Sequence, residues 1–223
     1  MRLAHLSPSR RRFVQQMAFA SATLVTPGLL AEELTKTPPL TEGPFYPDKM
    51  PLDTDNDLLV ISDKTNLSLG TVTHLTGRVL SSSGEPIRNA LVEIWQCDNN
   101  GAYLHTGSGN AEKRDAGFQG YGRFLTDWKG QYYFRTIKPV AYPGRTPHIH
   151  YKVTKGSQHL LTTQMLVKGD PQNERDGIFR VIKEARLRES LMAEFKAVKD
   201  SKIGELAAHW DVVVGVTPDE RKS

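Results

Sequence analysis

Short runs of β-forming residues recur along the chain, and this pattern restricts its fold more than any other feature. The runs cover residues 58–61, 71–80, 90–96, 131–137, 148–154, 160–167 and 210–216. Glycine, proline and asparagine, which favour tight turns, lie between them at 83–86, 99–101, 128–130 and 142–144. Strands of this length separated by turns are typical of antiparallel sandwiches. We therefore predict an all-β fold with an antiparallel β-sandwich core.

One segment departs from this pattern. Residues 176–198 are rich in Glu, Lys, Arg, Leu and Ala, with apolar residues at intervals that suit a helix. The apolar positions are Ile178, Ile182, Ala185, Met192, Phe195 and Val198. The sequence thus adds a minor C-terminal helical segment to the sandwich.

The first 31 residues read as a targeting segment. Ser9-Arg10-Arg11-Arg12-Phe13 precedes a mildly apolar run that ends near Leu30, an order that resembles a twin-arginine export signal. A basic amphipathic first helix is the alternative. We expect export to the periplasm or the extracellular space, with an extended arm at 32–57, one sandwich domain at 58–217 and a polar tail at 218–223.

The charge balance excludes one class of partner. The whole chain has a formal net charge of +4, but the first 31 residues contain four arginines and no acid. The remainder has 25 basic and 25 acidic residues and therefore lacks the basic excess typical of nucleic-acid binding. No further stretch has the roughly 18–20 apolar residues that a membrane span needs. Cys97 is the single cysteine, so no intrachain disulfide can form.

Two histidines in a β-like run form the first candidate metal site. In a strand, residues two apart share a face, so His148 and His150 point the same way and Ile149 the other. The pair could bind a metal, although strand histidines are also found simply solvated or hydrogen-bonded in a core. A cupin would need a Glu three or four residues later, and residues 151–154 contain none.

Two tyrosines in turn-like settings could complete such a site. They are Tyr103, after Asn100-Gly101-Ala102, and Tyr142, before Pro143. A free phenol has a pKa near ~10, but a trivalent cation favours the phenolate strongly enough to displace the proton at neutral pH. Taken alone, both tyrosines could equally be core or rim aromatics.

Assembled in order, these residues resemble the intradiol ring-cleavage dioxygenases. The resemblance rests on Tyr103, Tyr142-Pro143, Arg145 and Pro147-His148-Ile149-His150. It extends from about Thr41 to Val214 through further motifs, among them Thr41-Glu42-Gly43-Pro44-Phe45-Tyr46, Val92-Glu93-Ile94-Trp95-Gln96-Cys97-Asp98 and Gly130-Gln131-Tyr132-Tyr133-Phe134-Arg135. The chain is more similar to the protocatechuate-type branch and its exported relatives than to the catechol branch.

The resemblance implies one non-haem iron(III) ion per chain, bound at loops of the sandwich. Tyr103 and His148 would be equatorial ligands, and Tyr142 and His150 axial ligands. Tyr142 would also accept a substrate proton, and Arg145 would stabilise negative charge. The substrates would be a small aromatic diol and O2, and the product a cis,cis-muconate-type diacid.

Three further residues are weaker candidates for the substrate pocket or for contact with the ligands. They are Thr41, Tyr46 and Gln164, and ordinary packing is an equal alternative for each. Trp95 and Cys97 are expected in the core.

The chain departs from the family pattern at two places. Only Pro143-Gly144 separates Tyr142 from Arg145, where protocatechuate enzymes have a longer insertion, and Thr146-Pro147 replaces the more usual Pro-Ala. A non-catalytic metal- or carbohydrate-binding sandwich module is the alternative function. A hydrolase is disfavoured because the sequence has no Gly-x-Ser-x-Gly elbow. The ring substituents and a homo-oligomeric state are left open.

Overall fold

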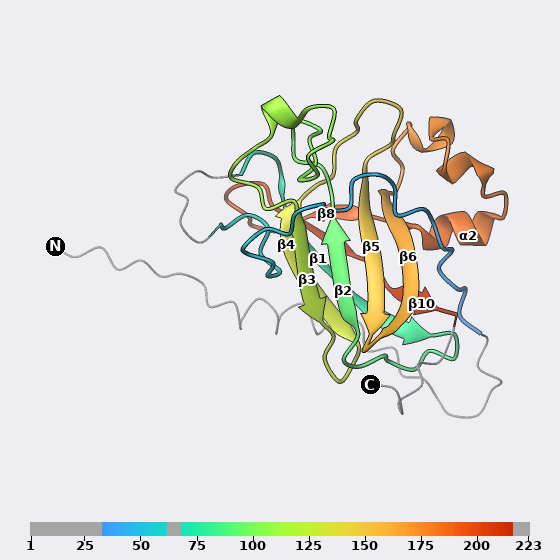
Figure 1. The fold of residues 1–223 in the computed structure, drawn as a ribbon. Coiled ribbons are helices and arrows are strands. Elements are labelled where there is room, and N and C mark those ends of the chain that lie inside the picture. Colours follow the sequence, from blue (N-terminus) through green and yellow to red (C-terminus); the bar gives the residue numbers. More distant parts are fainter. Residues whose placement is uncertain (1–32, 62–67, 216–223) are drawn as a thin grey trace. The chain divides into compact units, whose positions relative to one another are not determined.

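Two β-sheets dominate the computed structural model, which describes residues 33–61 and 68–215 (Figure 1). One sheet contains β1 (Val72–Ser81), β4 (Gln131–Ile137), β8 (Phe195–Ala197), β9 (Leu206–His209) and β10 (Val212–Val214). The other has the strand order β3 (Tyr121–Leu125), β2 (Leu91–Trp95), β5 (His148–Lys155), β6 (Gln158–Val167) and β7 (Met192–Ala193). The predicted all-β fold is confirmed.

Most strand pairs are antiparallel, but both sheets are mixed. Antiparallel pairing joins β3, β2, β5 and β6 in succession and also joins β1 to β4 and β8 to β9. Parallel pairs connect β1 with β9 and β10, and β6 with β7. Strands β7, β9 and β10, which each form one parallel pair, all follow the long segment after β6. The central strands β2, β5 and β6 pair with one another only in the antiparallel sense.

The main hydrophobic core takes alternate residues from both sheets. Ile149, Tyr151 and Val153 of β5 are fully buried, as is Ile94 of the neighbouring β2. They belong to one cluster with residues of the other sheet, including Leu75, Val79 and Phe134. Because strand residues alternate between faces, the even-numbered residues of β5 must project from the opposite face of the sheet.

An N-terminal arm covers that opposite face. Residues 33–46 contain no helix or strand and run across β5 and β6 (Figure 1). Leu40 N donates to the Thr162 carbonyl, and the Thr163 hydroxyl donates to the Pro38 carbonyl at 2.7 Å. The arm is therefore fixed to β6 by hydrogen bonds.

The helical part of residues 176–198 is much shorter than the apolar spacing suggested. Only α2 (Ala185–Ser190) is an α-helix, preceded by a 3-10 turn at Phe179–Val181 and followed by β7 and β8. Phe179 and Leu191 are buried against Leu166 of β6 in a separate apolar cluster. Packing on the sheet edge therefore overrides the helical propensity of these residues.

Other expectations differ in detail from the structure. Residues 58–61 form no strand: the first two lie in a turn, and Leu58 is buried in the core. Strands β3 and β9 were not predicted. The expected export signal at 1–31 and the tail at 218–223 lie outside the described residues. Within the described part of the chain, no helix is long and apolar enough to cross a membrane.

Gly77 lies where β1 passes close to the segment before β10. A Cβ built at this position would lie 1.8 Å from the Trp210 carbonyl oxygen and 2.5 Å from the Tyr132 hydroxyl. That hydroxyl donates to the same carbonyl, and Trp210 N donates to the Thr76 carbonyl at 2.9 Å. No side chain fits without separating these groups.

We predict that Gly77→Ala destabilises the protein by about 3 kcal/mol or more, because the added methyl meets backbone rather than a flexible side chain. Urea unfolding followed by tryptophan fluorescence measures the loss. Gly109→Ala is the matched control, since a Cβ there meets nothing within 4 Å. Equal stability of the two variants would contradict the prediction.

Candidate metal centre

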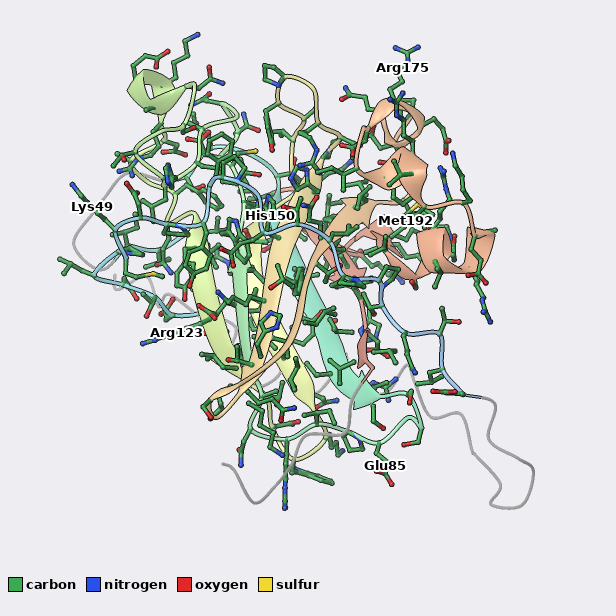
Figure 2. The ribbon with its side chains drawn as sticks, turned by 45° about the vertical axis from the view of Figure 1, so that its right-hand side comes forward. Lys49, Glu85, Arg123, His150, Arg175 and Met192 are labelled. Carbon is green, nitrogen blue, oxygen red and sulfur yellow. The ribbon has the colours of Figure 1, made fainter. Side chains whose placement is uncertain are left out.

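His148 and His150 lie side by side on the arm-covered face of the sheet. Both are buried, and their Nε2 atoms are 3.1 Å apart (Figure 2 labels His150, where the arm crosses β5). His148 Nδ1 is 2.6 Å from the Thr146 carbonyl oxygen, to which it must donate. The proton is thereby held on Nδ1, which leaves the Nε2 lone pair of His148 directed into the site.

Both imidazoles are neutral at physiological pH. Burial and the nearby Arg145 guanidinium lower the pKa of His148 to about 4. Burial, His148 and Arg145 lower the pKa of His150 well below its ordinary value. Neutral imidazoles are the form that binds metals.

Tyr103 reaches the histidines from the loop after β2. Its Oη is 3.3 Å from His148 Nε2, and its ring is buried. Asp98 shapes this loop by accepting hydrogen bonds from the backbone of Asn100 and Ala102, and Ser108 Oγ accepts one from Tyr103 N. The left-handed Gly101, at φ +76°, allows the loop to pass close to Tyr142.

Tyr142 comes from a tight turn just before β5. Arg145 N donates to the Tyr142 carbonyl at 2.9 Å, which closes the turn predicted at 142–144. The Tyr142 ring lies 5.5 Å from that of Tyr103 and 5.6 Å from that of His148, between ring centroids. The structure thus brings together all four residues that the sequence nominated as ligands.

Burial keeps the two tyrosines protonated unless a cation is present. It raises the pKa of Tyr103 well above the ordinary value, with smaller increases from Cys97 and Tyr142. Burial also raises the pKa of Tyr142, although Arg145 acts in the opposite direction. A positive charge among these groups would be needed to stabilise their phenolates.

Arg145 lies beside the four residues, and its side chain is 15% exposed. Its Nε donates to Asp176 Oδ2 at 2.8 Å, and an Nη donates to Gln164 Oε1 at 2.5 Å. Gln164 in turn donates to the Thr41 carbonyl of the arm at 2.8 Å. The ion pair between Arg145 and Asp176 is therefore mostly buried, and Gln164 connects it to the arm.

The arm also supplies aromatic walls. Phe45 stacks on Tyr103 with ring centroids 4.9 Å apart, a contact that the sequence reading missed although Phe45 lies in a motif that it singled out. Tyr46 donates to Glu93 Oε1 at 2.8 Å and so fastens the arm to β2.

Trp95, expected in the core, is fully buried, and its ring stacks on that of His150 with centroids 4.9 Å apart. Cys97 is buried, as predicted.

The donor set fits a hard trivalent cation. Three possible metal-binding atoms converge here, because both His150 Nε2 and Tyr103 Oη lie within hydrogen-bond distance of the Nε2 lone pair of His148. The described residues contain no group of three or more His, Cys, Asp or Glu arranged to hold a metal. A metal here would therefore use phenolate oxygens beside the imidazoles, and hard anionic oxygens favour iron(III) over softer ions.

Comparison with known proteins decides the family. The family described as Dioxygenase matches residues 41–215. The protocatechuate 3,4-dioxygenase beta chain of Burkholderia cepacia is 38% identical to this chain over 180 residues, which are 75% of each protein. The chain belongs to the intradiol dioxygenase family.

Other relatives of the family differ in length. The hydroxyquinol 1,2-dioxygenase of Corynebacterium glutamicum is 30% identical over 173 residues, which cover 69% of this chain and 52% of that relative. The dioxygenase domain of a dioxygenase carbohydrate-binding protein fusion from Streptomyces sp. SirexAA-E superposes with a TM-score of 0.63 at 28% identity. That match covers 82% of this chain and the whole of the domain.

The chain between Tyr142 and Arg145 forms a single tight turn. Gly144 has a φ of +83°, and a Cβ built there would meet no atom within 4 Å. The tip of the turn therefore faces open space in this member of the family.

We predict that the Tyr46–Glu93 hydrogen bond stabilises the arm more than the Glu42–Lys152 ion pair does. Glu93 is buried and accepts from both Tyr46 and Tyr121, whereas the side chain of Glu42 is 42% exposed. Tyr46→Phe should lower the free energy of unfolding by about 1.5–3 kcal/mol, and Glu42→Gln by less than about 1 kcal/mol. Urea unfolding of both variants tests this order, and the reverse order would contradict it.

Proposed function

We propose that the protein is a non-haem iron(III)-dependent intradiol dioxygenase acting on a catechol-type ring. It inserts both atoms of O2 and cleaves the ring between the two hydroxylated carbons, giving a cis,cis-muconate-type diacid. The convergence of two neutral imidazoles and two phenols, one buried and one half-buried, beside Arg145 carries this proposal. Membership of the intradiol dioxygenase family supports it.

One iron(III) ion per chain would be held by Tyr103, Tyr142, His148 and His150. When bound, it supplies the positive charge that stabilises phenolate oxygens of both the protein and the substrate. The hydrogen bond from His148 Nδ1 to the Thr146 carbonyl orients the imidazole for this role.

Tyr142 would accept a proton from the substrate. It is half-buried, whereas Tyr103 is fully enclosed, and Arg145 lowers its pKa against the effect of burial. Its phenolate oxygen would take the proton of one catechol hydroxyl as the substrate binds.

Arg145 would act as a fixed positive charge against the electron-rich ring. Asp176 and Gln164 hold its guanidinium in place, so little reorganisation is needed as negative charge develops. Phe45 and Trp95, stacked on Tyr103 and His150, exclude water from the ligand side of the site.

We predict that the iron(III)-loaded protein is coloured by tyrosinate-to-iron charge transfer and that anaerobic catechol shifts the band. Tyr142→Phe should lower O2 uptake by about 100-fold or more, since it removes a ligand and a base. Catechol, protocatechuate and hydroxyquinol form the substrate panel, because relatives are named for each.

Tyr133→Phe is the control variant. The Tyr133 hydroxyl contacts His74 in the sheet that does not carry the histidine pair, so its loss should leave both the charge-transfer band and the O2 uptake unchanged. A colourless iron-loaded protein, or undiminished O2 uptake in Tyr142→Phe, would contradict the mechanism. A coloured wild type that consumes no O2 with any of the three diols would favour the non-catalytic binding module.

We also propose that the chain is exported by the twin-arginine pathway to the periplasm or the extracellular space. The supporting observation is the order Ser9-Arg10-Arg11-Arg12-Phe13 before the apolar run. Replacing both Arg10 and Arg11 with Lys should retain the precursor in the cytoplasm, as measured by immunoblotting of cell fractions. Arg2→Lys is the control, and unchanged export of the Arg10/Arg11 variant would refute the proposal.

A further inference from the structure

Asp176 is a buried carboxylate that touches the site without being one of the four candidate ligands. It lies between the 3-10 turns Asn173–Arg175 and Phe179–Val181, and its side chain is 0% exposed. Oδ2 accepts hydrogen bonds from Arg145 Nε at 2.8 Å and from Thr146 N at 3.0 Å. Oδ1 accepts from the backbone N–H groups of residues 178 and 179. One oxygen thus serves the entry to β5, and the other serves its own loop.

The two contacts on Oδ2 lead to different parts of the site. The first fixes one edge of the Arg145 guanidinium, while Gln164 holds another. The second fixes Thr146, whose carbonyl accepts the Nδ1 proton of His148. The Thr146 hydroxyl is also held, by Asn173 Oδ1 at 2.6 Å. Oδ2 of Asp176 therefore contacts both the Arg145 guanidinium and Thr146, the residue that orients the candidate ligand His148.

We propose that Asp176 is the positioning residue that sets Arg145 and His148 relative to each other. This role rests on the proposed function for its effect on turnover, but its effect on Arg145 does not depend on catalysis. Because neither oxygen contacts a candidate ligand, Asp176 acts through Arg145 and Thr146 and not on the substrate.

An uncharged residue could not replace this carboxylate. Burial raises the pKa of Asp176, but the backbone donors and Arg145 outweigh it and leave the pKa below its ordinary value. The ionised group has two acceptor oxygens for four donors. In Asp176→Asn one oxygen becomes an NH2 group, which cannot accept a hydrogen bond. In either orientation of the amide, two of the four donors lose their acceptor and Arg145 loses its paired negative charge.

The first test is the solvent exchange of the Arg145 Nε–H, followed by 15N NMR on the full chain without added metal. We expect slow exchange in the wild type and exchange at least about 10-fold faster in Asp176→Asn. Asp170→Asn is the matched control, because Asp170 caps Gln172 N in the same loop, and it should match the wild type. Fast exchange in the wild type, or unchanged exchange in Asp176→Asn, would overturn the proposal. The wild-type measurement can refute the proposal even if Asp176→Asn does not fold.

The second test separates positioning from a general loss of structure. Outer partners of a metal ligand are worth about 10–100-fold in metal affinity or activity, so Asp176→Asn should lower both the iron(III) affinity and kcat by that range. With iron saturating, Asp176→Asn should lower kcat by a smaller factor in the Arg145→Gln background than in the wild type, because the part of its effect that acts through Arg145 is already lost. Fully additive losses in kcat would refute action through Arg145.

The outcomes distinguish this inference from the proposed function. If the wild type cleaves no diol, the proposed function fails, while the Nε–H exchange still decides whether Asp176 holds Arg145. If the wild type is active and the exchange is unchanged in Asp176→Asn, the enzyme assignment stands and the positioning role fails.

Discussion

The first half of strand β5 is buried on both faces, and the site depends on the alternation of its side chains between these faces. Ile149, Tyr151 and Val153 are fully buried in the core, which stabilises the fold by about 1.5–3 kcal/mol for each aliphatic side chain. That burial sets the register against β2 and β6, because a slip of one residue would turn the core face toward the site. The same burial therefore places His148 and His150 together on the other face.

Local sequence patterns were sufficient to predict a residue's position where that position depends only on the residue's own strand or turn. The period of two placed His148 and His150 on one face, and the turn residues at 142–144 placed the reversal that delivers Tyr142. Tyr103 could not be placed in this way, because its contact with His148 joins residues 45 positions apart. The family resemblance supplied that pairing, and the geometry is consistent with it.

The expectations that failed concern segments whose environment is made by distant residues. Residues 176–198 have helical composition, but Phe179 and Leu191 find an apolar partner in Leu166, and β7 and β8 pair with sheet edges. Asp176 and Phe45 escaped the sequence reading for the same reason. An acidic residue before a glycine, or an aromatic residue in a proline-rich arm, has many ordinary roles, and only the fold shows what each one contacts.

The position of the arm has a consequence for the order in which the protein assembles. The arm precedes every strand in the chain, yet it bonds to residues made much later: Pro38 to Thr163, 125 positions on, and Thr37 to Val213, 176 positions on. During synthesis the arm leaves the ribosome before the described strands do, but its partners Thr163 and Val213 follow only late in the chain. Such distant contacts form last, since they close the longest loops. Residues 37 and 38 of the arm can therefore dock only after β6 and β10 have been made, so this part of the arm is added after the strand that carries His148 and His150.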